Sequence, residues 1–301
     1  MPIWIPIAVT AALFQCWRTA MQQKLRGQMS VNAAGFVRYL YGLPMALILF
    51  LAALTVTGES VPTPNPAFFI WCAAGGLFQI LATNLLIMSF GYRNFAVGTA
   101  YAKTETVQSA IIALVILGEA LSPFAWFGII VGLVGVMTLS LAGRGLNLRE
   151  LALATAQPAA LCGLSAGLIF GFTTVFIKLG NLSLSSDSMV VRALFALVVS
   201  NSMQIVMQGS YLLWREPAEL KKTFTTWRTS MWVGTLSACG SACWFTGFAI
   251  ADVALVRAVG QIEIVFTLLF SRFYLKETLK RGDVAGLGFV VVGVLLIILL
   301  H

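Results

Sequence analysis

Long apolar runs are the feature that most constrains how this chain of 301 residues can fold. A helix needs about 20 apolar residues to cross a hydrocarbon core about 30 Å thick. The runs predict spans at 3–23, 31–57, 67–92, 96–117, 124–142, 158–180, 187–213, 230–250, 253–274 and 283–300. We therefore expect an all-α membrane protein with ten transmembrane helices.

The composition supports a membrane location. Hydrophobic residues make up 59% of the chain and charged residues 10%, whereas about a quarter of the residues of a soluble domain are charged. The formal net charge of +8 arises from Lys and Arg in the short connections between apolar runs. That placement indicates membrane orientation rather than nucleic-acid binding.

The Lys and Arg residues also predict which ends of the helices face the cytoplasm. Basic residues concentrate in the connections after the odd-numbered spans: Lys24, Arg26, Arg93, Arg144, Arg149, Arg215, Lys221, Lys222, Arg228, Lys276, Lys280 and Arg281. The even-numbered connections and the termini offer only Lys178. Positive loops remain in the cytoplasm, so we expect both termini outside an inner (plasma) membrane. The polar insert at 216–228 is expected to form a surface helix.

An internal repeat divides the chain into two halves, 1–145 and 155–301. A shift of 158 residues superposes Glu105 on Glu263, and a shift of 154 residues superposes Arg38 on Arg192. Each half contains five spans, an odd number, so the second half is expected to lie inverted relative to the first. Inverted repeats around a central cavity can open it to one side and then to the other, as carriers do.

Matched glutamates and glycines carry a resemblance to a known family. The first half reads Glu105…Glu119…Gly128…Gly132…Gly135 and the second reads Glu263…Glu277…Gly286…Gly293. This pattern resembles the EamA-type repeat of the drug/metabolite transporter superfamily, over essentially the whole chain. The resemblance implies ten helices in two inverted repeats, a central cavity and secondary transport. A proline often follows the first glutamate in this family, but Thr106 and Ile264 stand here, so we expect less strongly kinked helices.

Ionisable residues inside the spans are the main candidates for a site, because burying a charge in a bilayer costs roughly 2.5–3.5 kcal/mol. Each half brings one carboxylate and at least two cations to a similar depth: Glu105, Lys103 and Arg38 with Arg18, and Glu263, Arg257 and Arg192. Arg38–Glu105 and Arg192–Glu263 could alternate as gating ion pairs. Alternatively, the cations could bind a substrate carboxylate or phosphate while a glutamate takes an ammonium group or a proton. Pairs that only lock helices together remain a third interpretation.

Neighbouring side chains extend the candidate site. Tyr101 and Gln108 share a helix face with Glu105, whereas Gln261, Trp17 and Trp244 could line a cavity. Glu119 and Glu277 lie at span ends, where they are expected to bond to helix termini or loops.

These features favour a carrier over an enzyme. The only histidine is His301 and the five cysteines form no CxxC pair, so we expect neither a metal nor another cofactor. The five cations exceed the two glutamates, which favours export of a zwitterionic or anionic metabolite such as an amino acid. The alternative is a proton-coupled exporter of cationic or drug-like compounds that uses Glu105 and Glu263. The expected partners are a small-molecule substrate and the bilayer, and one copy is sufficient for the pathway.

Overall fold

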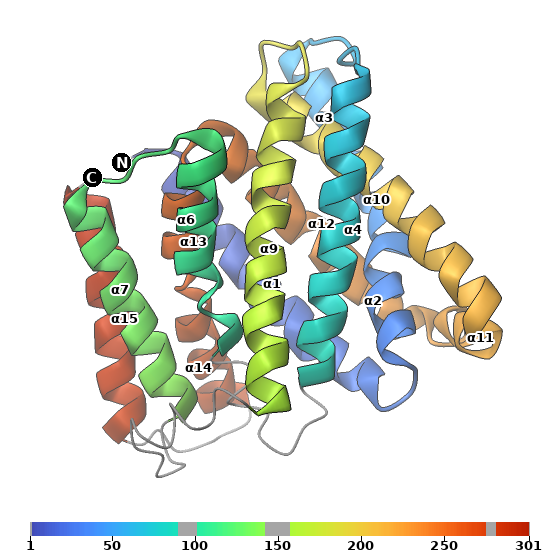
Figure 1. The fold of residues 1–301 in the computed structure, drawn as a ribbon. Coiled ribbons are helices and arrows are strands. Elements are labelled where there is room, and N and C mark those ends of the chain that lie inside the picture. The colour runs from blue at the N-terminus through green and yellow to red at the C-terminus, as the bar shows by residue number, and fades with distance from the viewer. Residues whose placement is uncertain (1, 90–100, 142–156, 275–280, 301) are drawn as a thin grey trace. The chain divides into compact units, whose positions relative to one another are not determined.

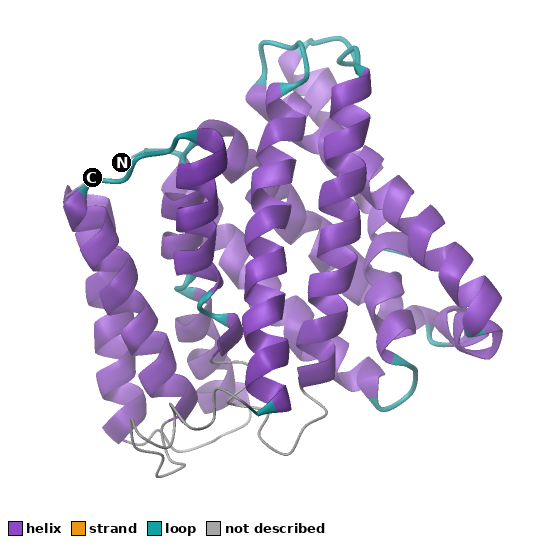
Figure 2. Cartoon of the chain, in the orientation of Figure 1, coloured by secondary structure: helices purple, strands orange, loops and turns teal. Residues whose placement is uncertain are grey.

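The computed structural model describes residues 2–89, 101–141, 157–274 and 281–300. These residues form helices joined by short connections (Figures 1 and 2). The helices are α1 (Trp4–Arg26), α2 (Val31–Leu40), α3 (Gly42–Thr57), α4 (Pro66–Ser89), α6 (Glu105–Leu117), α7 (Pro123–Leu141), α9 (Pro158–Leu182), α10 (Met189–Arg215), α11 (Pro217–Thr225), α12 (Trp227–Ile250), α13 (Val253–Gly260), α14 (Glu263–Tyr274) and α15 (Arg281–Leu300). The pairing of Thr63 with Ser185 is an isolated β-bridge, and no strand occurs in the described ranges.

Every predicted span coincides with one or two of these helices, so the all-α class is confirmed for the described residues. Within the described residues, five helical stretches are long and apolar enough to cross a membrane: 31–57, 66–89, 158–182, 189–215 and 227–250. The predicted count of ten transmembrane helices remains a prediction. Several residues used above lie outside the described ones: Arg93, Arg144, Arg149, Lys276, Glu277 and Lys280.

The chain forms two compact units, each built from segments of both predicted halves. The first comprises Met1–Ile80 and Thr173–Ala251, and the second comprises Leu81–Phe172 and Asp252–His301. The boundaries predicted at 1–145 and 155–301 refer to repeats along the sequence and remain a prediction.

The first unit packs α1 against α12, and α2, α3 and α10 around them. The predicted span 31–57 is divided at Tyr41, between α2 and α3. Pro44 accounts for the division, because proline lacks an N–H group and its ring clashes with the carbonyl four residues earlier, here that of Leu40. Gly234 permits close packing at this point, since an added Cβ would lie 2.4 Å from the Tyr41 Cβ atom.

The predicted surface helix is α11. The carboxylates of Glu216 and Glu219 form hydrogen bonds with residues at the start of α2. Ser30 donates its backbone N–H to Glu219 Oε2 at 2.6 Å. The Ser30 hydroxyl and the Asn32 amide both donate to Glu216. The corner between α10 and α11 is therefore bonded to the loop that follows α1.

We predict that acidification weakens the hydrogen bonds that Glu219 accepts at this corner. Hydrogen bonds from the Lys222 ammonium and the Ser30 amide hold the pKa of the Glu219 carboxyl below its ordinary value. Because the pKa is depressed in the folded protein, the stabilisation is complete above the ordinary carboxyl pKa of about 4.3. It is lost as the pH falls through the lower folded value. Glu219→Gln should therefore lower the melting temperature at pH 7. The difference in melting temperature between this variant and the unsubstituted protein should shrink towards pH 3. A difference that stays constant over this range contradicts the assignment.

In the second unit, α7 and α15 lie against each other through glycines. A Cβ added at Gly128 would lie 2.9 Å from the Gly293 carbonyl oxygen, and one added at Gly135 would lie 2.8 Å from that of Gly286. The contacts show that α7 and α15 run antiparallel. The repeat equates Gly128 with Gly286 and Gly135 with Gly293, so the two contacts are reciprocal.

We predict that Gly293→Ala destabilises the protein, because its Cβ would lie 2.6 Å from the Gly132 backbone nitrogen. Overpacking of this kind costs about 1–3 kcal/mol, which exceeds the gain of at most about 1 kcal/mol in helix propensity. Gly288→Ala on the same helix is the matched control, since its Cβ would meet nothing within 4 Å. Thermal unfolding should show a loss for Gly293→Ala alone, and equal melting temperatures would refute the close packing.

Candidate functional site

Two interrupted helices in the second unit place the candidate glutamates. Gln261 and Ile262 form a turn between α13 and α14, and Lys103 and Thr104 form a turn between the helical residues 101–102 and α6. The shift of 158 residues superposes these two turns. The predicted spans 96–117 and 253–274 are each interrupted by a turn that the apolar runs did not predict.

Local hydrogen bonds make both interruptions possible. The Thr104 amide and hydroxyl both donate to the Tyr101 carbonyl, at 3.1 and 2.6 Å. The Gln261 amide donates to the Ala258 carbonyl at 3.2 Å, and the Ile262 amide to that of Val259 at 3.1 Å. These bonds to the third preceding residue are those of a 3₁₀ turn. They satisfy backbone groups that a bilayer core could not hydrate.

Each interruption leaves a glutamate at the start of a new helix. Glu105 is the first residue of α6 and Glu263 the first residue of α14. The amino-terminal end of a helix carries a partial positive charge that stabilises a carboxylate. Gly167 lets α9 lie against the first turn, since an added Cβ would be 3.1 Å from the Glu105 amide nitrogen.

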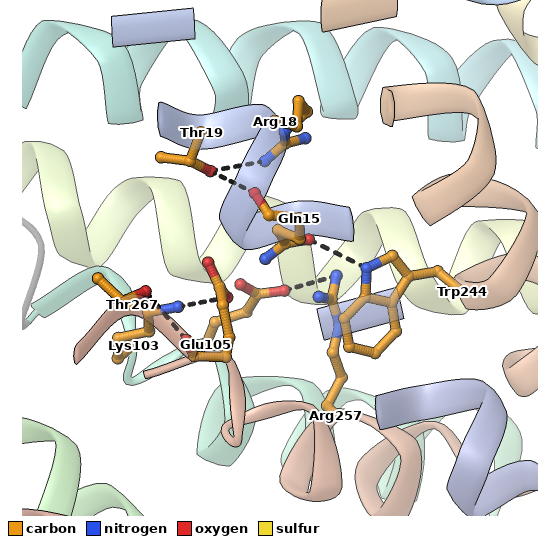
Figure 3. A network of polar contacts seen from close by, with 9 residues as sticks. Gln15, Arg18, Thr19, Lys103, Glu105, Trp244, Arg257 and Thr267 are labelled. Carbon is orange, nitrogen blue, oxygen red and sulfur yellow. Dashed lines mark hydrogen bonds and ion pairs between the residues drawn. The ribbon is translucent and has the colours of Figure 1, made fainter. Parts of the chain in front are cut away.

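Each glutamate forms an ion pair with a cation from the other half of the sequence. Glu105 Oε1 lies 2.7 Å from an Arg257 guanidinium nitrogen, and Lys103 Nζ lies 2.8 Å from Glu263 Oε2. Figure 3 shows the Arg257 side chain directed at the Glu105 carboxylate. All four side chains are at least three-quarters buried. We call these four residues the charge cluster.

The charge cluster is electrically neutral, with two cations and two carboxylates. A buried charge that loses its partner is strongly destabilising, so any ligand that enters must replace the interaction that it breaks. The cluster is not fully symmetric, because the repeat places Gln261 opposite Lys103. The cation of the second half lies one turn earlier, at Arg257.

Other predicted residues of the second unit contact α7 and α9. Tyr101 is buried and packs beside Ala160. Gln108 Oε1 lies against Gly167 of α9, and the Gln261 amide lies against Gly132 of α7. Neither amide atom of Gln261 has a hydrogen-bond partner in the described part of the chain.

Glu119 accepts a hydrogen bond from the Val253 amide at 2.9 Å, at the start of α13. Its predicted bonding to a helix terminus is confirmed.

The remaining candidates belong to the first unit. Arg38 is buried and donates to the Ser237 hydroxyl at 3.1 Å, whereas Arg18 donates to that of Thr19 at 3.4 Å. Trp17 is exposed and Arg192 is half-buried. The glutamates of the charge cluster are paired with Arg257 and Lys103, and the suggested gating pairs with Arg38 and Arg192 remain a prediction.

Gln15 is a residue that sequence reasoning missed. The buried Trp244 donates its indole N–H to Gln15 Oε1 at 3.0 Å (Figure 3). Gln15 lies three residues before Arg18 on α1, and this shared helix face was the available signal. Among the described residues, no group of three or more His, Cys, Asp or Glu side chains is placed to hold a metal ion.

We predict that Glu105 and Arg257 are energetically coupled. Glu105→Gln and Arg257→Gln should each destabilise the protein, because each leaves a buried charge without its partner. The double variant should be more stable than the sum of the two losses implies, by about 1–3 kcal/mol. Thermal unfolding of the four proteins measures this energy, and strictly additive losses would show that the contact contributes nothing. Glu219→Gln with Lys222→Gln is the control cycle, because that pair is more exposed and its coupling should be below about 1 kcal/mol.

The model of the EamA-like transporter family matches residues 2–141 and 157–299. A protein of known crystal structure is similar over 99% of this chain and 96% of its own, with a TM-score of 0.71 and 16% sequence identity. At that identity the likeness shows the fold alone.

Proposed function

We propose that this chain, which belongs to the EamA-like transporter family, exports a zwitterionic metabolite such as an amino acid. The family establishes a multi-pass membrane transporter of small molecules rather than an enzyme, and it confirms the resemblance read from the glutamate and glycine pattern. The substrate, the direction and the mechanism of transport form the proposal. The observation that carries it is the neutral charge cluster at two helix interruptions.

A zwitterion suits the charge cluster because it can replace both partners of an ion pair at once. Its carboxylate would bind the Arg257 guanidinium, which can donate two parallel hydrogen bonds. Its ammonium group would bind the Glu105 carboxylate. No charge is then left unpaired, whereas a simple anion or cation would leave one glutamate or one cation without compensation.

Alternating access of two inverted five-helix repeats is the proposed mechanism. The equivalent turns before Glu105 and Glu263 support it, as do the reciprocal glycine contacts between α7 and α15. Short 3₁₀ segments within helices often act as hinges. Exchange of one ion pair for substrate at such a turn would couple binding to a change of helix angle.

The remaining parts of the proposal follow from the sequence. Ten helices would cross an inner membrane with both termini outside, and one copy would form the pathway. A proton is the coupling ion in the alternative, in which Glu105 and Glu263 titrate while a cationic or drug-like compound is exported.

A ligand screen on the purified protein tests the substrate class. Melting temperatures should rise with a zwitterionic metabolite and not with simple organic anions or cations. A ligand at 100 times its dissociation constant stabilises by about 2.7 kcal/mol. Glu105→Gln and Arg257→Gln should abolish the rise, whereas Lys221→Gln, an exposed change on α11, should retain it.

Two outcomes would redirect the proposal. Stabilisation by cations alone, lost in Glu105→Gln or Glu263→Gln, favours the proton-coupled exporter. Stabilisation by anions alone, lost in Arg257→Gln, favours an anion carrier. Uptake of the ligand into inside-out vesicles, compared with right-side-out vesicles, then determines the direction.

A further inference from the structure

The corner formed by α11 lies where two membrane-crossing helices end. Helix α10 ends at Arg215 and α12 begins at Trp227, and both are long and apolar enough to cross a bilayer. Helix α11 connects them and packs on α2, α10 and α12 within the first unit. A short helix between two such ends must lie near the boundary between hydrocarbon and headgroups.

Aromatic side chains at this corner are exposed rather than packed. Trp214 has a relative exposure of 73%, and Phe224, Trp227 and Trp232 are each about half exposed or more. In a soluble protein such a patch would be a liability. At a bilayer boundary, tryptophan is the favoured residue, because its ring enters the apolar region while its N–H faces the headgroups.

Two arginines lie over these aromatic rings. The Arg215 guanidinium carbon lies 4.0 Å from the centre of the Trp214 ring, and that of Arg228 lies 5.6 Å from the centre of the Trp227 ring. A guanidinium that lies over an aromatic ring is attracted to it and still carries a planar edge of N–H donors. That edge can donate two hydrogen bonds to the oxygens of a phosphate group.

The acidic residues of the corner are engaged by the protein. Glu216 accepts hydrogen bonds from Ser30 and Asn32, and Glu219 accepts from Ser30 and pairs with Lys222. Arg215, Lys221 and Arg228 are exposed. The surface of the corner is therefore basic and aromatic, although its sequence contains both signs of charge.

We propose that the α11 corner, defined by Arg215, Lys221 and Arg228 with Trp214 and Trp227, binds anionic phospholipid headgroups. The guanidinium edges and the Lys221 ammonium bind the phosphates, and the two tryptophans hold the corner at headgroup depth. The lipid stabilises the junction of α2, α10 and α12, because α11 contacts all three helices. This site is separate from the charge cluster and does not depend on the proposed substrate.

Titration with anionic lipid tests the proposal. Protein in phosphatidylcholine nanodiscs receives increasing phosphatidylglycerol, and native mass spectrometry and melting temperature report binding. The variant Arg215→Gln/Lys221→Gln/Arg228→Gln should need about 100-fold more anionic lipid, since each basic residue near an anionic surface contributes about a factor of five. Arg93→Gln/Arg144→Gln/Arg149→Gln removes the same charge from connections predicted on the same membrane face, and should lose less affinity, because no tryptophan adjoins these arginines in the sequence to hold them at headgroup depth.

A single conservative variant keeps the test decisive if the triple variant fails to fold. Arg215→Lys keeps the charge but loses the planar edge of N–H donors, so it should show an intermediate loss. Equal lipid binding by all variants would overturn the proposal, as would an equal loss in the control variant. Stabilisation by soluble glycerol phosphate would identify a free phosphate ligand in place of a lipid. An equal response to phosphatidylcholine would show that the site does not recognise the negative charge of the headgroup.

Discussion

Hydrocarbon offers no water to a backbone amide or to a lone charge, and this constraint governs the centre of the second unit. The helices before Glu105 and Glu263 are interrupted, yet the amides of Thr104, Gln261 and Ile262 find carbonyls three residues back. The interruption in turn gives each carboxylate a helix amino terminus, and a cation from the other half completes its neutralisation. The same two turns therefore satisfy their backbone amides and place the carboxylates where cations neutralise them.

The closely packed helices α7 and α15 support this arrangement. Helix α13 packs on α7 and α15, whose glycines bring the two backbones into contact. Small residues at helix interfaces replace the hydrophobic driving force that is absent within lipid. The second unit thus combines a tightly packed pair of helices with two turns held by short-range hydrogen bonds.

The sequence predicted the helices well because bilayer thickness sets the length of each apolar run. It also identified Glu105, Lys103, Arg257 and Glu263, since ionisable residues are rare within such runs. It did not predict which cation meets which carboxylate, because that depends on the register of helices more than 150 residues apart. The turn at Thr104 carries no proline or glycine, so it also escaped notice. The division at Tyr41 was not predicted either, although Pro44 was an available signal.

Gln261 occupies the place of Lys103 in the second half, and the missing cation is supplied one turn earlier by Arg257. Exchanging the conformations of the two halves therefore does not regenerate an identical molecule. Under the proposed alternating access, the inward-facing and outward-facing forms would differ in free energy, and an empty carrier would rest mainly in one of them.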